Sequence, residues 1–294
     1  MSSTSPLLPA SGIALAKRRR GELLWDRVVI PLGCLALVAW LSWCYVYAFP
    51  VEFWEVTCTT DQPLYSRHES YFPDQEFASM RSTLLKSDLM LVKNALNGNN
   101  FGHTRGVVMS FNEEGLEELR EVGRRRADIA AMLKLFDAVR VPRANAGVIN
   151  VLRARPIEDL DWADAQWKHA GFAVKPQGAG EHVDNTLRRV ERWGERVYLA
   201  AYQTSVLYLQ VPEDIKGGGF VLNASSVSSV PEEGTITLDP KEGTVVSFRG
   251  DTWHSVEQFS TATGLPRVSL VVEQYKVRKE LYGTVTKLWT SAPL

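Results

Sequence analysis

Hydrophobic and polar positions divide the 294-residue chain into stretches of different character. Residues 28–49 form an apolar run without a formal charge. Within residues 74–140, apolar positions recur between charged ones at helical spacing, which predicts helices over about 74–96 and 113–139. After residue 140, short runs rich in Val, Ile, Tyr and Thr are separated by Gly, Pro and Asp. This pattern is typical of a β-sandwich or jelly roll.

The β-rich part contains no helix that is strong enough to build parallel β–α–β units. Its short runs predict strands over 147–152, 172–175, 197–211, 219–223, 235–238, 244–249 and 268–275. The expected fold is therefore mainly β, with supporting N-terminal helices.

The apolar run predicts one transmembrane helix ahead of this fold. Its 22 residues, VVIPLGCLALVAWLSWCYVYAF, are long enough as a helix to cross a hydrocarbon layer of about 30 Å. Trp and Tyr gather in its second half, where amphipathic rings favour the membrane interface. A secretory signal peptide is the alternative, but its apolar region would be shorter, and the bulky rings make a poor cleavage site.

The flanking charges predict the orientation of this helix. Residues 17–20 (KRRR) and Arg27 precede it, whereas Glu52 and Glu55 follow it, so we expect a cytoplasmic N-terminus. The protein would be a single-pass type II membrane protein, and the part of the chain after residue 49 would be lumenal, in the endoplasmic reticulum or Golgi, or extracellular. Asn223-Ala-Ser225 would then be a glycosylation acceptor if exposed. The predicted parts are a basic cytoplasmic tail (1–27), the transmembrane helix (28–49), a stem (50–73), a helical support region (74–140) and a jelly-roll core (141–294).

Charge and cysteine content exclude several classes of protein. The formal net charge is −1, so no basic footprint for nucleic acid is present. All three cysteines lie within the first 58 residues, so a disulfide framework or a cysteine-rich zinc site in the predicted core is excluded. The partners that remain are the membrane, through 28–49, and a polypeptide or small-molecule substrate.

The candidate chemistry lies in three motifs of the β-rich part. In an extended segment, His182 and Asp184 of the His-x-Asp motif point to the same face and can reach one cation. His254 follows a β-rich run and a Gly-Asp turn. Two histidines and one carboxylate leave coordination positions of a metal open, as in non-haem Fe(II) oxygenases, although Mn or Co can share this ligand set. Arg267 starts the last strand, where its planar fork suits a carboxylate, and Ser269 lies on the same face.

The order of these motifs resembles the 2-oxoglutarate and Fe(II)-dependent dioxygenases, particularly the prolyl 4-hydroxylase-like branch. The resemblance covers about residues 145–276 and includes Tyr208-Leu209, Gly217-Gly218-Gly219-Phe220 and Arg267-x-Ser269. It implies a double-stranded β-helix, a jelly-roll variant. It also implies Fe(II), 2-oxoglutarate and O2 as cofactor and co-substrates, and leaves room for ascorbate.

The resemblance assigns roles to individual residues. His182, Asp184 and His254 would bind the metal, Arg267 would hold the 2-oxoglutarate carboxylate, and Tyr208 and Ser269 would add hydroxyl groups. Tyr208 is equally well explained as a packing aromatic, and Thr204 or Tyr202 lies on the same strand face. Collagen-type prolyl 4-hydroxylases commonly have Lys at the Arg267 position, which leaves the subfamily open.

Several functions remain compatible with the sequence. The first is hydroxylation of prolyl residues in secretory or cell-wall polypeptides. The second is the same oxygenase chemistry on a small molecule, lipid or sugar. The third is a non-catalytic β-sandwich binding module, because a fold does not determine a function. A cupin-type metal protein would need further His or Glu ligands near His182, and only Glu181 is close.

Overall fold

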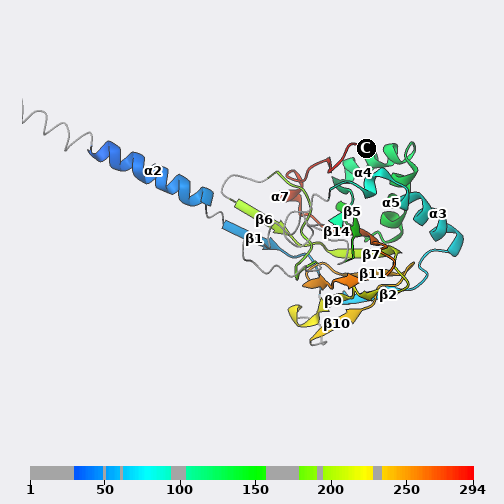
Figure 1. Ribbon diagram of the computed structural model, residues 1–294. Coiled ribbons are helices and arrows are strands. Elements are labelled where there is room, and N and C mark those ends of the chain that lie inside the picture. Colours follow the sequence, from blue (N-terminus) through cyan, green and yellow to red (C-terminus); the bar gives the residue numbers. More distant parts are fainter. Residues whose placement is uncertain are drawn as a thin grey trace, which may run out of the picture. The chain divides into compact units, whose positions relative to one another are not determined.

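The computed structural model describes residues 30–48, 51–59, 62–93, 104–156, 179–190, 195–227 and 234–294. The chain divides into two compact units, residues 1–53 with 192–196 and residues 54–191 with 197–294. In the first unit, helix α2 (Ile30–Ala48) covers most of the apolar run, and side chains 31–43 are exposed (Figure 1). Among the described residues, no helix combines the length and the hydropathy that crossing a membrane requires.

The second unit is built on an antiparallel eight-stranded sheet with the order β15-β4-β5-β14-β7-β11-β2, in which β3 also pairs with β5. Strand β14 is central and is buried at all nine positions. Its even-numbered apolar residues face one side of the sheet, and its odd-numbered residues face the other, as strand geometry requires. The strands are β2 (Tyr65–His68), β3 (Thr104–Arg105), β4 (Val108–Asn112), β5 (Ala146–Ala154), β7 (Gln203–Gln210), β11 (Val245–Arg249), β14 (Arg267–Tyr275) and β15 (Leu288–Thr290).

A smaller sheet packs against the odd-numbered face of β14. It has the order β10-β9-β12, formed by β10 (Thr235–Leu238), β9 (Phe220–Asn223) and β12 (His254–Val256). Apolar side chains from both sheets form one buried cluster, which includes Val206, Tyr208, Phe220, Leu222, Phe248 and Val271. Two short pairs complete the β structure: β8 (Lys216–Gly217) with β13 (Phe259–Ser260), and β1 (Val51–Glu55) with β6 (Glu195–Leu199). Two sheets around a common core give the mainly β, jelly-roll-like fold expected from the sequence.

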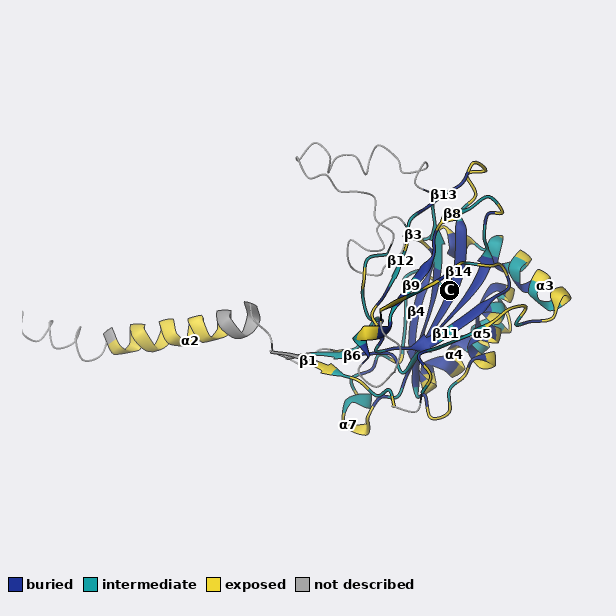
Figure 2. Ribbon diagram, turned by 90° about the horizontal axis from the view of Figure 1, so that it is seen from below, coloured by how far each residue is buried: buried dark blue, intermediate teal, exposed yellow. Residues whose placement is uncertain are grey.

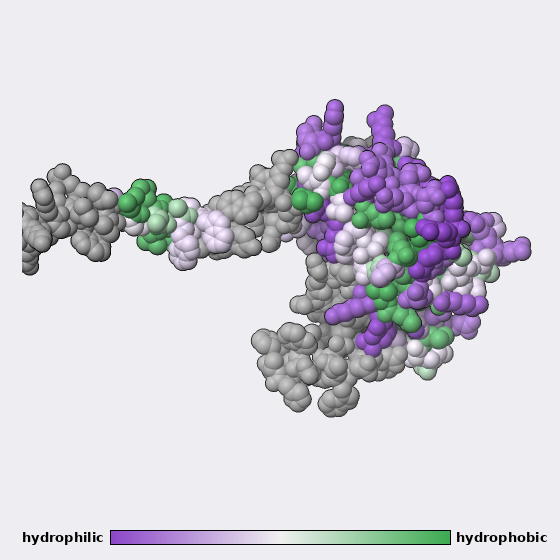
Figure 3. Space-filling model, turned by 90° about the horizontal axis from the view of Figure 1, so that it is seen from above, coloured by the Kyte–Doolittle hydropathy of each residue, from purple (hydrophilic) through white to green (hydrophobic). Residues whose placement is uncertain are grey.

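Helices cover the other face of the large sheet. α3 (Asp74–Leu85), α4 (Glu113–Gly123) and α5 (Ala127–Ala138) lie beside the sheet (Figure 2). Their buried apolar side chains belong to the same core cluster as the even-numbered residues of β14. The side chain of Asn112 caps α4 by accepting the Gly115 N–H at 3.0 Å. Leu116 and Leu119 of this helix are buried, whereas its glutamates are exposed. Figure 3 accordingly shows hydrophilic side chains over much of the face seen from above. The remaining short helices are η2 (Asp88–Met90), η5 (Ala224–Ser226) and α7 (Lys279–Tyr282).

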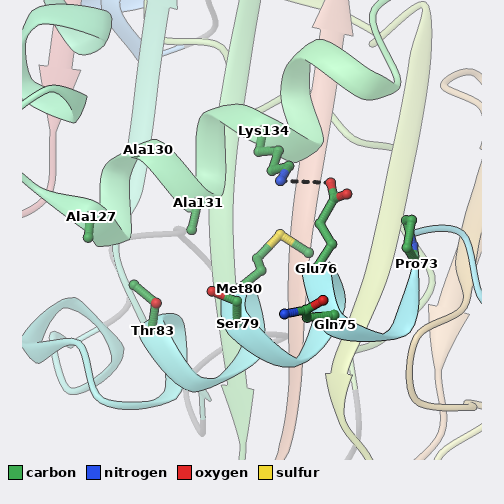
Figure 4. A pocket seen from close by; sticks show the side chains of 10 residues that line it. All are labelled: Pro73, Gln75, Glu76, Ser79, Met80, Thr83, Ala127, Ala130, Ala131 and Lys134. Atoms are coloured by element: carbon green, nitrogen blue, oxygen red, sulfur yellow. Dashed lines mark ion pairs between the residues drawn. The ribbon is translucent and has the colours of Figure 1, made fainter.

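A hollow of about 650 Å³ lies between α3 and α5 (Figure 4). Its charged lining residues, Glu76 and Lys134, pair with each other at 2.7 Å. Small side chains of α5 face this hollow. A separate cavity lies between the two sheets, and the hollow shares no lining residue with it. Its lining residues are Pro73, Gln75, Glu76, Ser79, Met80, Thr83, Ala127, Ala130, Ala131 and Lys134.

The structure corrects several predicted elements. The helix predicted over 113–139 is two helices, because Arg126 has an extended backbone (φ −122°, ψ 108°) and Gly123 is a weak helix former. The helix predicted over 74–96 ends at Leu85, and the Ser87 side chain caps the 3₁₀ turn that follows. The strand predicted over 197–211 is divided between β6 and β7. Strands β2 and β4 lie within segments predicted as stem and helical support. The strand predicted over 172–175 lies outside the described residues.

Candidate metal centre

The three predicted metal ligands meet on the side of the cavity formed by the smaller sheet. His254 begins β12, and His182 forms a two-way backbone bridge with it, with both N···O distances at 2.9 Å. This bridge places His182 beside β12, although no named strand contains it. Asp184 follows two residues later, and its backbone oxygen accepts the Ala201 N–H at 3.1 Å. Backbone hydrogen bonds therefore fix the segment that carries His182 and Asp184 against the rest of the fold.

The side chains converge as ligands of one cation would. One ligand atom from each of His182, Asp184 and His254 lies within 4.8 Å of the other two. Each histidine places its Nε2 atom 3.6 Å from a different carboxylate oxygen of Asp184. The two imidazole rings are tilted by 52°, with their centroids 4.3 Å apart. This spacing leaves room for a metal ion between the three groups.

Backbone carbonyl groups hold both imidazole rings in the orientation that metal binding needs. The Nδ1 atom of His182 lies 2.6 Å from the Gly180 oxygen, and that of His254 lies 3.0 Å from the Thr252 oxygen. A carbonyl oxygen can only accept, so each Nδ1 carries a proton, and in the neutral ring the Nε2 lone pair points toward Asp184. Metal-binding histidines are commonly oriented in this way. The donor set and its hydrogen bonds therefore fit a divalent transition metal.

Burial and mutual charge shape the protonation of this site. Burial opposes ionisation of Asp184, but the adjacent His254 and His182 hold its pKa well below the usual range. Burial favours the neutral form of His182, but the protonated ring can donate from Nε2 to the Asp184 carboxylate, and this hydrogen bond and the carboxylate charge raise the pKa of His182 above its ordinary value. Protons and a metal ion therefore compete for the same histidine.

Apolar side chains surround the metal ligands. The Phe248 ring centroid lies 4.7 Å from that of His254, and the Phe220 centroid lies 5.4 Å from it. The cavity between the sheets is lined by Asn150, Leu152, Ala179, His182, Asp184, Thr204, Val206, Tyr208, Phe220, Phe248, His254, Val256, Arg267, Ser269, Val271 and Glu273. Apolar atoms make up most of the exposed surface of this cavity, which limits the entry of water.

Arg267 reaches the same cavity from the start of β14. Its side chain is buried, and Nη1 donates to the Gly218 oxygen at 2.5 Å. Gly218 has a φ of +78°, and this turn presents its carbonyl group to the guanidinium. Among the described residues, no carboxylate lies within 4.0 Å of Arg267. Burial lowers the pKa of the guanidinium, but arginine remains a cation in proteins. A buried cation without an anionic partner is suited to a carboxylate ligand.

Hydroxyl groups accompany Arg267 in the cavity. Ser269 is paired with Tyr208 across β14 and β7, and both are buried. Burial raises the pKa of Tyr208, against the opposing effect of Arg267, so the phenol keeps its proton. Of the two alternatives to Tyr208, Thr204 also lines the cavity. Tyr202 does not; its ring instead lies 3.2 Å from the Lys276 ammonium group.

Two functional candidates were missed by the sequence interpretation. Glu273 lines the cavity, and Thr186 donates its hydroxyl to that carboxylate at 2.6 Å. The available signal was the alternation along β14, which puts residue 273 on the same face as Arg267 and Ser269. Nothing local in the sequence links Thr186 to Glu273, because they are 87 residues apart.

Other residues considered from the sequence lie away from the cavity or outside the described chain. His68 is exposed on β2, and His103 and His169 fall outside the described residues. Trp253 is 44% exposed, because the next residue, His254, takes the inward position at the start of β12. Asn223 of the predicted glycosylation sequon is half-buried, and its amide donates to Glu181 at 2.9 Å.

Over most of its length, the chain matches solved structures of prolyl 4-hydroxylases and 2-oxoglutarate/Fe(II) oxygenases. A prolyl 4-hydroxylase from Pseudomonas putida is 15% identical; the match covers 72% of this chain and 92% of that chain, with a TM-score of 0.39. An oxidoreductase of the 2-oxoglutarate/Fe(II) oxygenase family from Burkholderia pseudomallei is 13% identical; the match covers 81% of this chain and 98% of that chain, with a TM-score of 0.39. A viral collagen prolyl hydroxylase from Paramecium bursaria Chlorella virus-1, solved with 2-oxoglutarate, is 13% identical; the match covers 74% of this chain and 99% of that chain, with a TM-score of 0.38.

No family model matches the chain, and no curated protein matches it in sequence. Structural likeness at these identities and TM-scores carries no inference about activity. Function must therefore be derived from the chemistry of the cavity.

Proposed function

We propose that this chain is an Fe(II)- and 2-oxoglutarate-dependent oxygenase that hydroxylates its substrate. The observation that carries the proposal is one cavity that contains both a His-Asp-His ligand set and a buried arginine without a carboxylate partner among the described residues. The first group fits a divalent metal, and the second fits an anionic co-substrate. Mn or Co can occupy the same ligand set, so the choice of Fe(II) depends on the proposed reaction.

Each group in the cavity has a distinct task in this proposal. His182, Asp184 and His254 would hold the metal. Arg267 would bind the distal carboxylate of 2-oxoglutarate through its planar fork, and Tyr208 would donate a hydroxyl hydrogen bond to it. When bound, Fe(II) and 2-oxoglutarate would supply the activation of O2: one oxygen atom would enter succinate as 2-oxoglutarate loses CO2, and the other would be placed on the substrate. The surrounding apolar side chains would keep water away from the reacting groups.

The first substrate candidate is a prolyl residue in a secretory or cell-wall polypeptide. The motif order that resembles the prolyl hydroxylase branch supports it, and so does the lumenal or extracellular location predicted from the charges around residues 28–49. We retain that location, with a single-pass type II anchor, as part of the proposal. Protease protection in sealed microsomes tests it: the epitope of a C-terminal tag should survive until detergent is added. A small molecule, lipid or sugar is the alternative substrate.

Succinate formation tests the proposed activity. The full-length protein, loaded anaerobically with Fe(II), should form succinate from 2-oxoglutarate when O2 is admitted, and His182→Ala should not. Stimulation by proline-rich peptides, but not by the same peptides with Pro replaced by Ala, would support the prolyl substrate. A wild-type protein that binds neither the metal nor 2-oxoglutarate would contradict the oxygenase and leave the non-catalytic binding module.

A further inference from the structure

Glu273 is a buried carboxylate in the cavity that has no task in the function proposed above. It lies on the same face of β14 as Arg267 and Ser269, six residues beyond Arg267, and is 1% exposed. Asp184 lines the same cavity. The cavity that holds the metal ligands therefore contains two carboxylates.

The hydrogen-bond partners of Glu273 are all neutral. The Thr186 hydroxyl lies 2.6 Å from both carboxylate oxygens, and the Thr186 N–H donates at 3.4 Å. The Tyr275 hydroxyl donates to the same carboxylate. No Lys, Arg or His side chain lies within 4.0 Å of Glu273 in the part of the chain that the structure describes. A buried carboxylate that meets only neutral donors is costly unless a cation is nearby.

These hydrogen bonds connect Glu273 to the segment that carries Asp184. Thr186 lies two residues after Asp184, in a segment outside the named strands. Backbone hydrogen bonds fix this segment at His182 and Asp184, and the side chain of Glu273 fixes it at Thr186. A shift of Thr186 would move Asp184, whose carboxylate lies 3.6 Å from the Nε2 atom of each histidine.

We propose that Glu273 is a positioning residue for the metal centre. Through Thr186 it holds Asp184 in place, and its carboxylate, which a bound divalent cation would keep ionised, strengthens the binding of that cation by His182, Asp184 and His254. This inference rests on the metal site of the proposed function. Groups that orient metal ligands commonly change metal affinity roughly 10- to 100-fold when they are replaced.

Titration of the full-length protein with Co(II) under anaerobic conditions tests the proposal, because Co(II) absorption reports both affinity and ligand geometry. Glu273→Ala removes the charge and the hydrogen bonds and should weaken Co(II) binding roughly 10- to 100-fold. Glu273→Gln keeps a hydrogen-bond acceptor without the charge and should show a smaller loss. Thr186→Val should weaken binding and alter the absorption bands, whereas Thr186→Ser should resemble the wild type.

Gln274→Ala is a matched control on the same strand. Gln274 is fully buried and lies on the side of the sheet away from the cavity. Its side-chain amide donates a hydrogen bond to the Val139 oxygen and accepts one from the Val141 N–H. This variant should lower the melting temperature without changing the Co(II) dissociation constant. If Glu273→Ala does not fold, Glu273→Gln and Thr186→Val provide the same comparison.

The outcomes separate this inference from the proposed function. A wild-type protein that does not bind Co(II) contradicts the metal site itself. If the wild type binds and the folded Glu273 variants bind equally well, the positioning role is overturned while the metal site stands. In the double variant Thr186→Val/Glu273→Gln, a loss smaller than the sum of the single losses supports action through Thr186. A fully additive loss overturns that linkage.

Discussion

Replacing Arg267 gives the most direct test of the co-substrate site. Arg267→Leu replaces the buried guanidinium with a smaller apolar side chain, and no other residue in the described cavity lining carries an Arg or Lys cation. One hydrogen bond to a charged group is worth about 1.5–3 kcal/mol, and each 1.4 kcal/mol changes affinity about tenfold. A two-pronged contact contains two such bonds, so the dissociation constant of 2-oxoglutarate should rise about 100-fold or more.

The assay is calorimetric titration of 2-oxoglutarate into anaerobic, Mn(II)-loaded protein. Under these conditions 2-oxoglutarate should bind without being consumed. Arg267→Lys keeps the charge but loses the planar fork, so it should fall between the wild type and Arg267→Leu. Arg249→Leu is the matched control, because Arg249 is also buried but is already paired with Asp251 at 2.7 Å. A folded Arg267→Leu protein that binds 2-oxoglutarate as tightly as the wild type would refute the assignment of this arginine.

Three further predictions concern the same cavity. Tyr208→Phe removes one hydroxyl donor, worth about 0.5–1.5 kcal/mol, so the KM for 2-oxoglutarate should rise up to about tenfold with unchanged Co(II) affinity; equal kinetics would leave Tyr208 as a packing residue. Gly218→Ala should lower the unfolding free energy by about 1–2 kcal/mol in urea denaturation, because φ there is +78° and a Cβ atom would lie 3.1 Å from two neighbouring side chains. Burial, and secondarily Asp184, raises the pKa of Glu273 to about 8, and the pKa of His182 is also raised. The folded metal-free protein therefore binds more protons than the unfolded chain, and its free energy of unfolding should fall as the pH rises from about 5 to about 8 in urea titrations. Co(II) affinity should increase over the same range, and a metal-free stability that rises with pH would contradict these shifts.

The sequence predicted most accurately those elements whose signal is local. The alternating run at 235–238 coincides with β10, and the run at 268–275 differs from β14 by one residue. The candidate metal ligands could also be predicted, because an extended backbone directs both side chains of a His-x-Asp pair to the same face. The separation of 113–139 into two helices was harder to see, since its apolar spacing continues across the break at Arg126.

Contacts between distant segments could not be predicted in this way. β4 lies between β15 and β5 in the large sheet, but it comes from a segment between two helices, and its five residues show no strand pattern that differs from their surroundings. The hydrogen bond from Arg267 to Gly218 joins residues 49 apart, and the one from Thr186 to Glu273 joins residues 87 apart. Such pairs depend on how the sheets close around the cavity, which no short stretch of sequence specifies.

The distribution of charge along β14 gives the cavity a direction. Arg267 and Glu273 lie on one face of the strand, and six residues at about 3.3 Å each separate their Cα atoms by about 20 Å. A dianionic co-substrate is attracted toward Arg267 and repelled from Glu273, whereas a divalent cation is attracted toward Asp184 and Glu273. Replacing Arg267 should therefore raise the dissociation constant of 2-oxoglutarate and leave that of Co(II) unchanged. Replacing Glu273 should weaken Co(II) binding, and saturating metal should then restore 2-oxoglutarate affinity to at least the wild-type value. If Glu273→Gln weakens 2-oxoglutarate binding even with saturating metal, the assignment of the Arg267 end to 2-oxoglutarate and of the Glu273 end to the metal is wrong.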